Sequence, residues 1–330
     1  MAVVAALVMV ACGSSEGAND APVSSVPDSA TDDTPVIDLG PGTAIADGFV
    51  VPEGADLLLP PLPSGGSTWQ GIAPDVTWHA RLRAWQPVVA FAGLVAQAAT
   101  AGFELTSLGG PGGAGCTASV DPPGEAEGAL VPVEDLTASD DLAAVYCAAN
   151  GRRTIDGHEE QISLVTELAD GGGGPVASGS VRFQRWPAGV VPTTFGDPLV
   201  EPEPVVLPFE PADAVPGLGP GELIDDSRGE ARLVAGSRLV APVETGICQG
   251  GFAAVVEVTG DPDAVFDGYA RQIRAWVEPY GLPYGEGTAE LFGRSVREAR
   301  GTGDDSSSFT ATMVSAEGEQ PRLLFELCGG

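Results

Sequence analysis

Positive charge is what this sequence has least of. Its 330 residues include 15 basic and 46 acidic ones, so the formal net charge is −31. Every basic residue is an arginine, lysine is absent, and the first arginine is Arg81. Nucleic-acid binding needs clustered positive charge, because the bound phosphates must be neutralised. The composition therefore excludes nucleic acid as an expected partner.

Side chains that commonly carry catalysis are also scarce. Only two histidines occur, His79 and His158, and the missing lysine rules out a Ser-x-x-Lys motif. His79 alternates with Thr77 and Arg81 on a predicted strand, which places it on a polar sheet face. We therefore expect no enzyme, no catalytic residue and no cofactor.

The amino end carries a signal of its own. Residues 1–11 are apolar without a break, and Cys12 follows directly. This run is too short for a membrane span, which needs about 20 residues, but it suits the apolar core of a secretion signal. The sequence Met9-Val10-Ala11-Cys12 resembles the lipobox of lipoprotein precursors from GC-rich, Gram-positive-like bacteria. The resemblance implies that Cys12 carries lipid and becomes the mature amino terminus.

The next segment, 13–47, is rich in Ser, Asp, Pro, Gly and Thr and has few large apolar side chains. Such a composition buries too little surface to offset its ordering entropy, so it predicts a flexible acidic tether. With lipid on Cys12, the chain would be held at the extracytoplasmic face of the cell membrane. The expected partners are the membrane, through the lipid anchor, and an envelope protein or cell-wall polymer.

Four cysteines remain besides Cys12, and outside the cytoplasm disulfides are the ordinary state. Four cysteines allow three pairings. We favour Cys116–Cys147 and Cys248–Cys328, because each pair falls within one half of the chain. Zinc is disfavoured: no two cysteines lie two to four residues apart, and neither histidine adjoins one. No metal site is expected.

A proline-rich segment, 187–225, divides the chain into modules at 48–186 and 226–330. The two modules share Pro87/Pro262, Phe91/Phe266, Gly93/Gly268 and Gln97/Gln272, all 175 residues apart. Upstream, the stretch that begins at Gly54 parallels the one that begins at Gly236. These echoes predict a tandem duplication. The apolar residues of the linker, Val205 to Leu207 and Phe209, suggest that part of it lies along a domain.

The predicted fold class is α+β: two tandem modules, each an antiparallel sheet with one main helix, in the approximate order β-β-α-β-β-β. The second helix should start at an N-cap, Asp261, with Pro262 as its first residue. The turns expected in the first module are Asn150-Gly151, Asp156-Gly157 and a hairpin at 171–174, and 109–140 is expected to be a loop. The expected first helix is 88–101, and the expected strands are 77–84, 103–107, 141–149, 160–169, 176–185, 231–241, 252–259, 288–299, 308–316 and 322–328.

Few side chains stand out as candidate binding residues. His158 lies beside Asp156, Glu159 and Glu160, which could raise its pKa or bind a divalent ion, although a charged turn explains the cluster equally well. Gln97, Tyr269 and Gln272 could line matching grooves if the modules face each other. A hydrogen bond to the protein itself would explain Gln97 as well as a ligand does.

Three functions are compatible with these features. The first is a lipid-anchored, non-catalytic envelope protein whose modules bind a partner. The second is a carrier that holds a small or apolar ligand between helix and sheet. The third is an extracytoplasmic hydrolase that uses His158, which would need a serine or carboxylate within hydrogen-bond reach of the ring.

Overall fold

In the computed structural model of the protein, two antiparallel sheets carry most of the described chain. Cys12, Cys248 and the glycine run at 171–174 lie outside the residues that it describes. Those residues are 39–63, 69–108, 115–120, 129–137, 142–170, 175–192, 196–200, 202–208, 217–225, 230–246, 251–303 and 307–328.

The first sheet has the strand order β1-β2-β8-β7-β6-β3-β9, and β4 pairs with β6 and β5. All of its pairings in the described chain are antiparallel. Its strands are β1 (Asp56–Pro63), β2 (Val76–Arg83), β3 (Glu104–Ser107), β4 (Cys116–Val120), β5 (Ala129–Val131), β6 (Leu142–Ile155), β7 (His158–Asp170), β8 (Pro175–Arg185) and β9 (Asp197–Pro198).

The second sheet has the order β12-β14-β18-β17-β16-β15, and β13 pairs with β14. A separate ribbon pairs β10 (Leu223–Asp225) with β11 (Ala231–Arg232). The strands of the second sheet are β12 (Ser237–Leu239), β13 (Glu244–Gly246), β14 (Gly251–Val258), β15 (Tyr284–Leu291), β16 (Arg294–Thr302), β17 (Ser308–Ser315) and β18 (Arg322–Cys328).

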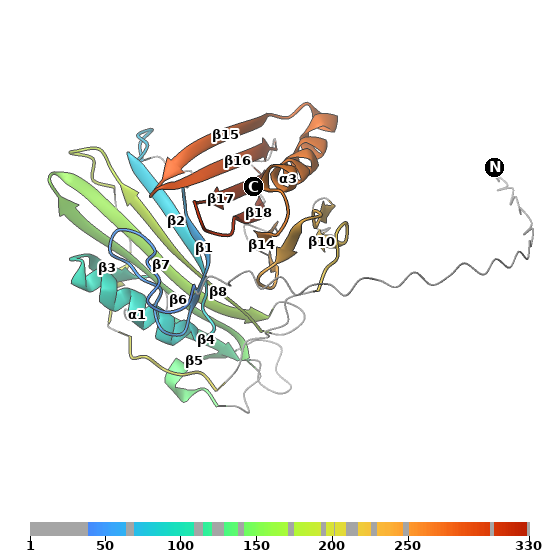
Figure 1. The fold of residues 1–330 in the computed structure, drawn as a ribbon. Helices are drawn as coiled ribbons and strands as arrows, with labels where there is room; N and C mark the ends of the chain where they lie inside the picture. Colours follow the sequence, from blue (N-terminus) through green and yellow to red (C-terminus); the bar gives the residue numbers. More distant parts are fainter. Residues whose placement is uncertain are drawn as a thin grey trace, which may run out of the picture. The chain divides into compact units, whose positions relative to one another are not determined.

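Each sheet carries one α-helix against one face: α1 (Pro87–Thr100) on the first and α3 (Pro262–Val277) on the second (Figure 1). Short 3₁₀ turns occupy Val133–Asp135 and Glu278–Tyr280. Helix α3 begins as the sequence predicts, because the Asp261 side chain accepts hydrogen bonds from the amides of Asp263 and Ala264. The described chain therefore belongs to the predicted α+β class, with mostly antiparallel strands and few helices.

Apolar side chains fill the layer between each helix and its sheet. In the first layer Phe91 and Leu94 of α1 pack among residues such as Trp78. In the second layer Phe266 and Tyr269 of α3 pack against Phe325 and its neighbours. These side chains are almost fully buried, so the alternation of the strands directs every second residue into a helix–sheet core.

The chain passes through the two sheets in related orders. The strand before the helix, β2 or β14, pairs with a strand that follows the helix, β8 or β18. After α1 come β3, then β4 and β5, and then β6, β7 and β8, which pair in sequence; after α3 come β15 to β18, which also pair in sequence. The second sheet thus has the order β-β-β-α-β-β-β-β along the chain, two strands more than the sequence predicts.

One extra strand is β13, and the other comes from a hairpin within 288–299, which was predicted as one strand. The hairpin joins β15 to β16 through Phe292 and Gly293. Both residues have positive φ angles, 50° and 74°, as a two-residue hairpin turn requires. A phenylalanine at such a position is unusual. The prediction was wrong because the turn has no Asn-Gly or Asp-Gly signal.

The Asn150-Gly151 turn was predicted wrongly, because both residues lie inside β6. Gly151 is needed there for packing: a Cβ atom at this position would come within 2.7 Å of Leu105 Cδ2 and 2.8 Å of Ile162 Cγ2. The Asp156-Gly157 turn is confirmed, since these residues join β6 to β7 with φ angles of 51° and 81°. The same dipeptide signal thus marks a turn in one case and close packing in the other.

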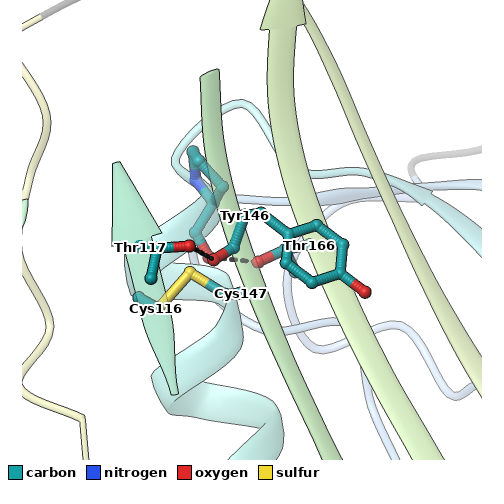
Figure 2. The surroundings of a disulfide bond; sticks show 6 residues. Cys116, Thr117, Tyr146, Cys147 and Thr166 are labelled. Atoms are coloured by element: carbon teal, nitrogen blue, oxygen red, sulfur yellow. Dashed lines mark hydrogen bonds between the residues drawn. A yellow bond between two sulfur atoms is a disulfide. The ribbon is translucent and has the colours of Figure 1, made fainter. Parts of the chain in front are cut away.

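The expected loop at 109–140 contains β4 and β5 among its described residues. A disulfide joins Cys116 of β4 to Cys147 of β6, which is the pairing that the sequence favours (Figure 2). Beside it, the Thr117 hydroxyl donates to the Tyr146 carbonyl at 3.4 Å, and the Thr166 hydroxyl donates to the Pro87 carbonyl of α1 at 2.8 Å. Cys328 is also disulfide-bonded; the Cys248–Cys328 pairing stays a prediction.

Two segments differ from their predicted roles. Residues 39–47, expected in the tether, pack on the first core, where Ile45 is 3% exposed. The expected strand at 231–241 is divided into β11 and β12 by Gly236.

Two other segments complete the first half. The Leu-Pro-rich run at 56–63 is strand β1, although its prolines cannot donate to a neighbour. Part of the linker lies along a domain, as its apolar residues suggest: Leu207 is in the first core, while Val206 is exposed.

Candidate functional site

The two sheets meet through the faces that are turned away from their helices. At one end the contact is apolar: Leu58, Leu59 and Leu62 of β1 pack against Val255, Leu324 and neighbouring side chains of the second sheet. Arg322 of β18 also donates hydrogen bonds to the carbonyls of Leu57 and Leu58. The apolar end therefore holds the sheets together and leaves their polar ends opposite each other.

A cavity of about 560 Å³ lies between these polar ends. Strands β1, β2, β7 and β8 supply the wall from the first sheet, and β13, β16, β17 and β18 supply the wall from the second. Strand alternation explains the polarity, because the apolar residues of each strand point to its helix and leave every second, polar residue in the cavity. The walls include hydroxyl groups from Ser178, Ser180, Ser308, Thr310 and Thr312.

Arg81 links the two walls. Its guanidinium donates to Glu244 at 2.7 Å and to Glu326 at 3.1 Å, although Arg81 belongs to β2 of the first sheet. Only 16% of the Arg81 side chain is exposed. Burial works against its charge, but the two carboxylates outweigh burial and raise the pKa of Arg81. The result is a permanently charged contact between the sheets.

His79 lies two residues before Arg81 and lines the same cavity. Burial, together with the charges of Arg81 and Arg182, lowers the pKa of His79 to about 3, so its ring is neutral at pH 7. In the described part of the chain, His79 Nδ1 and Arg81 Nε are buried side-chain atoms with no hydrogen-bond partner. Buried polar atoms are ordinarily paired, and these two therefore mark a place where a polar group can bind.

Carboxylates complete the lining of the cavity. Glu167 of β7 has a raised pKa, because it is partly buried and lies near Glu244. Glu298 of β16 faces the cavity from the other sheet. The cavity thus combines hydroxyls, carboxylates, a neutral imidazole and guanidinium groups, a set that suits a small polar ligand better than an apolar one.

His158 lies at the start of β7, outside this cavity. Its Nδ1 atom is 3.0 Å from the carbonyl oxygen of Trp186 and 3.8 Å from an Asp75 carboxylate oxygen. Its neighbour Glu160 is fully buried and forms ion pairs with Arg153 and Arg185. The carboxylates beside His158 in the sequence therefore serve the fold, and the His158 ring is held by a backbone carbonyl.

Gln97, Tyr269 and Gln272 lie on the helices, so the structure places none of them in the cavity between the sheets. Gln97 Oε1 accepts from the Val50 amide at 2.8 Å, beside a hollow of about 320 Å³. Gln272 makes two bonds to the backbone of Arg232, at 2.8 and 2.9 Å. The buried Tyr269 hydroxyl lies 2.9 Å from Ser237 Oγ. Each side chain thus bonds to the protein itself.

The sequence analysis did not select Arg81, Glu244, Glu326 or Glu167. A usable signal existed for two of them. Arg81 alternates with the apolar residues Ala80 and Leu82 in a strand. Glu326 is the sole charged residue within the apolar run 323–328. An isolated acid and an isolated base in two buried strands suggest an ion pair, but only the folded chain shows that they meet.

Among the described residues, no group of three or more His, Cys, Asp or Glu side chains is arranged to hold a metal ion. Neither α1 nor α3 combines the length and the apolar character of a membrane-spanning helix.

Comparisons with known proteins give no family. No family model matches the chain, and no curated protein matches it. Three solved structures resemble it weakly: a tesB protein of Mycobacterium avium subspecies paratuberculosis, an acyl-CoA thioesterase II of Mycobacterium marinum, and a hot dog fold protein of unknown function from Alicyclobacillus acidocaldarius.

The identities to these three structures are 9%, 12% and 11%, and the TM-scores are 0.15, 0.13 and 0.15. The matches cover 77–79% of this chain and 91–93% of the others. At these TM-scores the likeness assigns neither a fold family nor an activity.

Proposed function

We propose that this protein is a lipid-anchored, extracytoplasmic binding protein that holds a small polar ligand, without catalysis, in the cavity between its two sheets. The observation that carries the binding half is the cavity itself, in which Arg81 joins both walls and buried polar atoms of His79 and Arg81 lack a partner. The anchoring half rests on the lipobox-like residues that end at Cys12.

The location of the cavity favours a polar ligand over an apolar one. A carrier of apolar ligands was expected to bind between helix and sheet, but buried side chains such as Phe91 and Phe266 occupy those layers. The cavity lies on the opposite face of each sheet and is lined by charged and hydroxyl groups. The hydrolase alternative has less support, because the Asp75 carboxylate lies 3.8 Å from His158 Nδ1, beyond hydrogen-bond reach, and that atom lies 3.0 Å from the Trp186 carbonyl oxygen instead.

We also infer that the two halves descend from a tandem duplication. The residues shared at a spacing of 175 do matching work: Gly93 of α1 lets Pro52 approach, as Gly268 of α3 does for Val234, with Cβ atoms that would come within 2.8 and 2.5 Å. Gln97 bonds to the backbone of Val50, in the segment that contains Pro52. Gln272 bonds to the backbone of Arg232, in the segment that contains Val234. The second echo agrees, since Gly54 and Gly236 both turn with positive φ.

Ligand binding can be tested on protein released gently from its own cell envelope. Native mass spectrometry should detect a noncovalent small molecule on the wild-type chain and on a Thr288→Trp control, whose side chain lies on the exposed strand β15. A Ser180→Trp variant, which fills the cavity, should lose it. The proposal fails if Ser180→Trp and wild type carry the same molecule, or if no molecule is found on either.

The anchor has a separate test. Mass spectrometry of the envelope-extracted chain should find diacylglycerol on Cys12, and Cys12→Ser should move the protein into the soluble culture fraction. An unmodified Cys12 in the wild-type protein contradicts the anchor and leaves the binding proposal standing.

A further inference from the structure

We propose that the ligand of the cavity between the sheets is a hydroxylated small acid, whose acid group is held between Arg182 and Arg300. This inference rests on the binding function proposed above and names the chemistry of its ligand. Three observations support it: the partners of the arginines, the positions of Arg182 and Arg300, and the polar groups around these two residues.

Most arginines of this acidic chain are occupied. Ion pairs, hydrogen bonds or other contacts engage all of the described arginines except Arg182, Arg271 and Arg300. With 46 acidic residues against 15 basic ones, an arginine without a carboxylate partner is unexpected. Two of these three arginines line the same cavity, whereas Arg271 lies on the exposed face of α3.

Arg182 and Arg300 reach the cavity from different sheets. Arg182 lies on β8, directly opposite His79 of β2 in the strand register. Arg300 lies on β16, opposite Thr310 of β17. Both side chains keep exposed surface, so a ligand that enters from solvent meets them first. Guanidinium groups bind the planar oxygens of carboxylates and phosphates through paired N–H donors. The two arginines therefore form the acid-binding part of the cavity.

Deeper in the cavity, polar groups can pair with a ligand that both donates and accepts hydrogen bonds. Arg81 Nε–H is a buried donor without a partner, and the neutral His79 ring can donate or accept at Nδ1 according to its tautomer. Five serine and threonine hydroxyls add groups that do both. Hydroxyl groups on the ligand match this lining, because each can donate to one wall and accept from the other.

The carboxylates of the cavity fit the same ligand. Glu244 and Glu326 share the single positive charge of Arg81, so this pair is partly neutralised, and Arg182 and Arg300 supply the positive charge for an incoming anion. Glu298 and Glu167 remain; burial and the nearby Glu244 raise the pKa of Glu167. Both can accept hydrogen bonds from ligand hydroxyls. A hydroxylated acid therefore uses every kind of group in the lining, whereas a simple cation would leave the two arginines unmatched. A sugar acid and a sugar phosphate share this chemistry.

The test uses the full chain with Cys12→Ser and its disulfides oxidised, titrated calorimetrically with glucuronate, glucose 6-phosphate, glucose and glucosamine. At least one of the two acids should bind at least tenfold more tightly than glucose and glucosamine, and the acid that binds best identifies the oxyanion. Arg182→Gln and Arg300→Gln should each weaken that acid at least tenfold. Arg271→Gln, the matched control outside the cavity, should leave its affinity unchanged.

Several results overturn this inference. Glucose or glucosamine binding as tightly as the acids would show that the acid group is not recognised, and so would equal affinities for wild type, Arg182→Gln and Arg300→Gln. If the chain is folded and binds neither acid, the inference is overturned as well. Native mass spectrometry separates this failure from failure of the proposed function: a neutral or cationic molecule lost in Ser180→Trp leaves the binding function standing.

Discussion

The first and second halves of this protein have related strand orders, but different contacts surround their two helices. Helix α3 has a capping aspartate, Asp261, and an exposed polar face with charges of both signs. Helix α1 has no side-chain cap, and its preceding residue, Gln86, instead accepts from the Leu207 amide. Residues 39–51 and Leu207 join the first core, so the apolar α1 is covered on more than one side. A helix needs a polar face only where solvent reaches it.

The halves also differ in the charge that they bring to the cavity. The first sheet supplies Arg81, His79 and Arg182 with one carboxylate, Glu167, whereas the second supplies Glu244, Glu326 and Glu298 as well as Arg300. A sheet paired with an identical copy would place like charges opposite each other. Related sheets can become complementary when only the faces opposite their helices differ. Four experiments test this difference between the halves.

The largest effect is expected at the matched core positions Phe91 and Phe266. Each side chain is at most 1% exposed beneath its helix. Truncation of a buried phenylalanine leaves a cavity, so Phe91→Ala and Phe266→Ala should each lower the free energy of unfolding by about 3–5 kcal/mol. Urea denaturation measures both, with Arg271→Ala as the exposed control. A difference above about 2 kcal/mol between them would show that the two cores are not equivalent.

The contact between the halves should break next. Arg81→Met removes the guanidinium and leaves Glu244 and Glu326 close together and partly buried, which should cost about 2–4 kcal/mol. Tryptophan fluorescence and circular dichroism should then report separate unfolding transitions for the two halves. Coincident transitions with unchanged stability would mean that the apolar contact around β1 alone joins the sheets.

His79 should give the first half a pH dependence that the second half lacks. The pKa is lowered from 6.5 in the unfolded chain to about 3 in the folded one, so between these values the unfolded state binds more protons. Stability should therefore fall as the pH falls from about 6.5 toward about 3. Arg81, Arg182 and the cavity carboxylates face the ring, and their charges also act on it.

The variant His79→Gln removes this titration. Its stability should fall less steeply than that of wild type between pH 6.5 and pH 4, by about 2–3 kcal/mol over that interval. Thermal unfolding at a series of pH values measures the slope. Parallel slopes for variant and wild type would contradict the assignment.

The smallest effect separates the two glutamines. Gln272 makes two hydrogen bonds to its covering segment and Gln97 makes one. Gln272→Ala should therefore cost about 1–2 kcal/mol and Gln97→Ala about 0.5–1 kcal/mol in the free energy of unfolding. Hydrogen exchange should show faster exchange of the Arg232 amide in the first variant and of the Val50 amide in the second. An unchanged exchange rate in either variant would contradict the hydrogen bond between that helix and its covering segment.

Local patterns in the sequence predict much of this fold. The stripe Phe266, Tyr269 and Ile273 and the cap Asp261 place α3 correctly, because helical spacing and capping act within a few residues. The strands on either side of α1 follow from alternation for the same reason. The hairpin at Phe292 and the strand at Gly151 escape prediction, because a left-handed phenylalanine and a glycine packed on Leu105 depend on distant neighbours.

The candidate site was less accessible to prediction. Its residues lie far apart in the sequence: the ion-paired Arg81 and Glu326 are separated by 245 positions. Their isolated charges suggest an ion pair but do not show which partner each meets, and His158, the histidine that the sequence marked, lies elsewhere. Selection of Gln97 and Gln272 was informative in another way, because their matched spacing reflects matched backbone contacts rather than a ligand.

The sequence by itself determines the negative charge, the lipobox-like start, the favoured Cys116–Cys147 bridge and the repeated helix signals, since composition and short-range spacing suffice for each. Only the tertiary structure decides that two helix-covered sheets place their polar faces opposite each other, with Arg81 between Glu244 and Glu326. The physical reason is that strand alternation fixes which side chains leave the core, while packing of the β1 leucines on the second sheet fixes what those side chains meet.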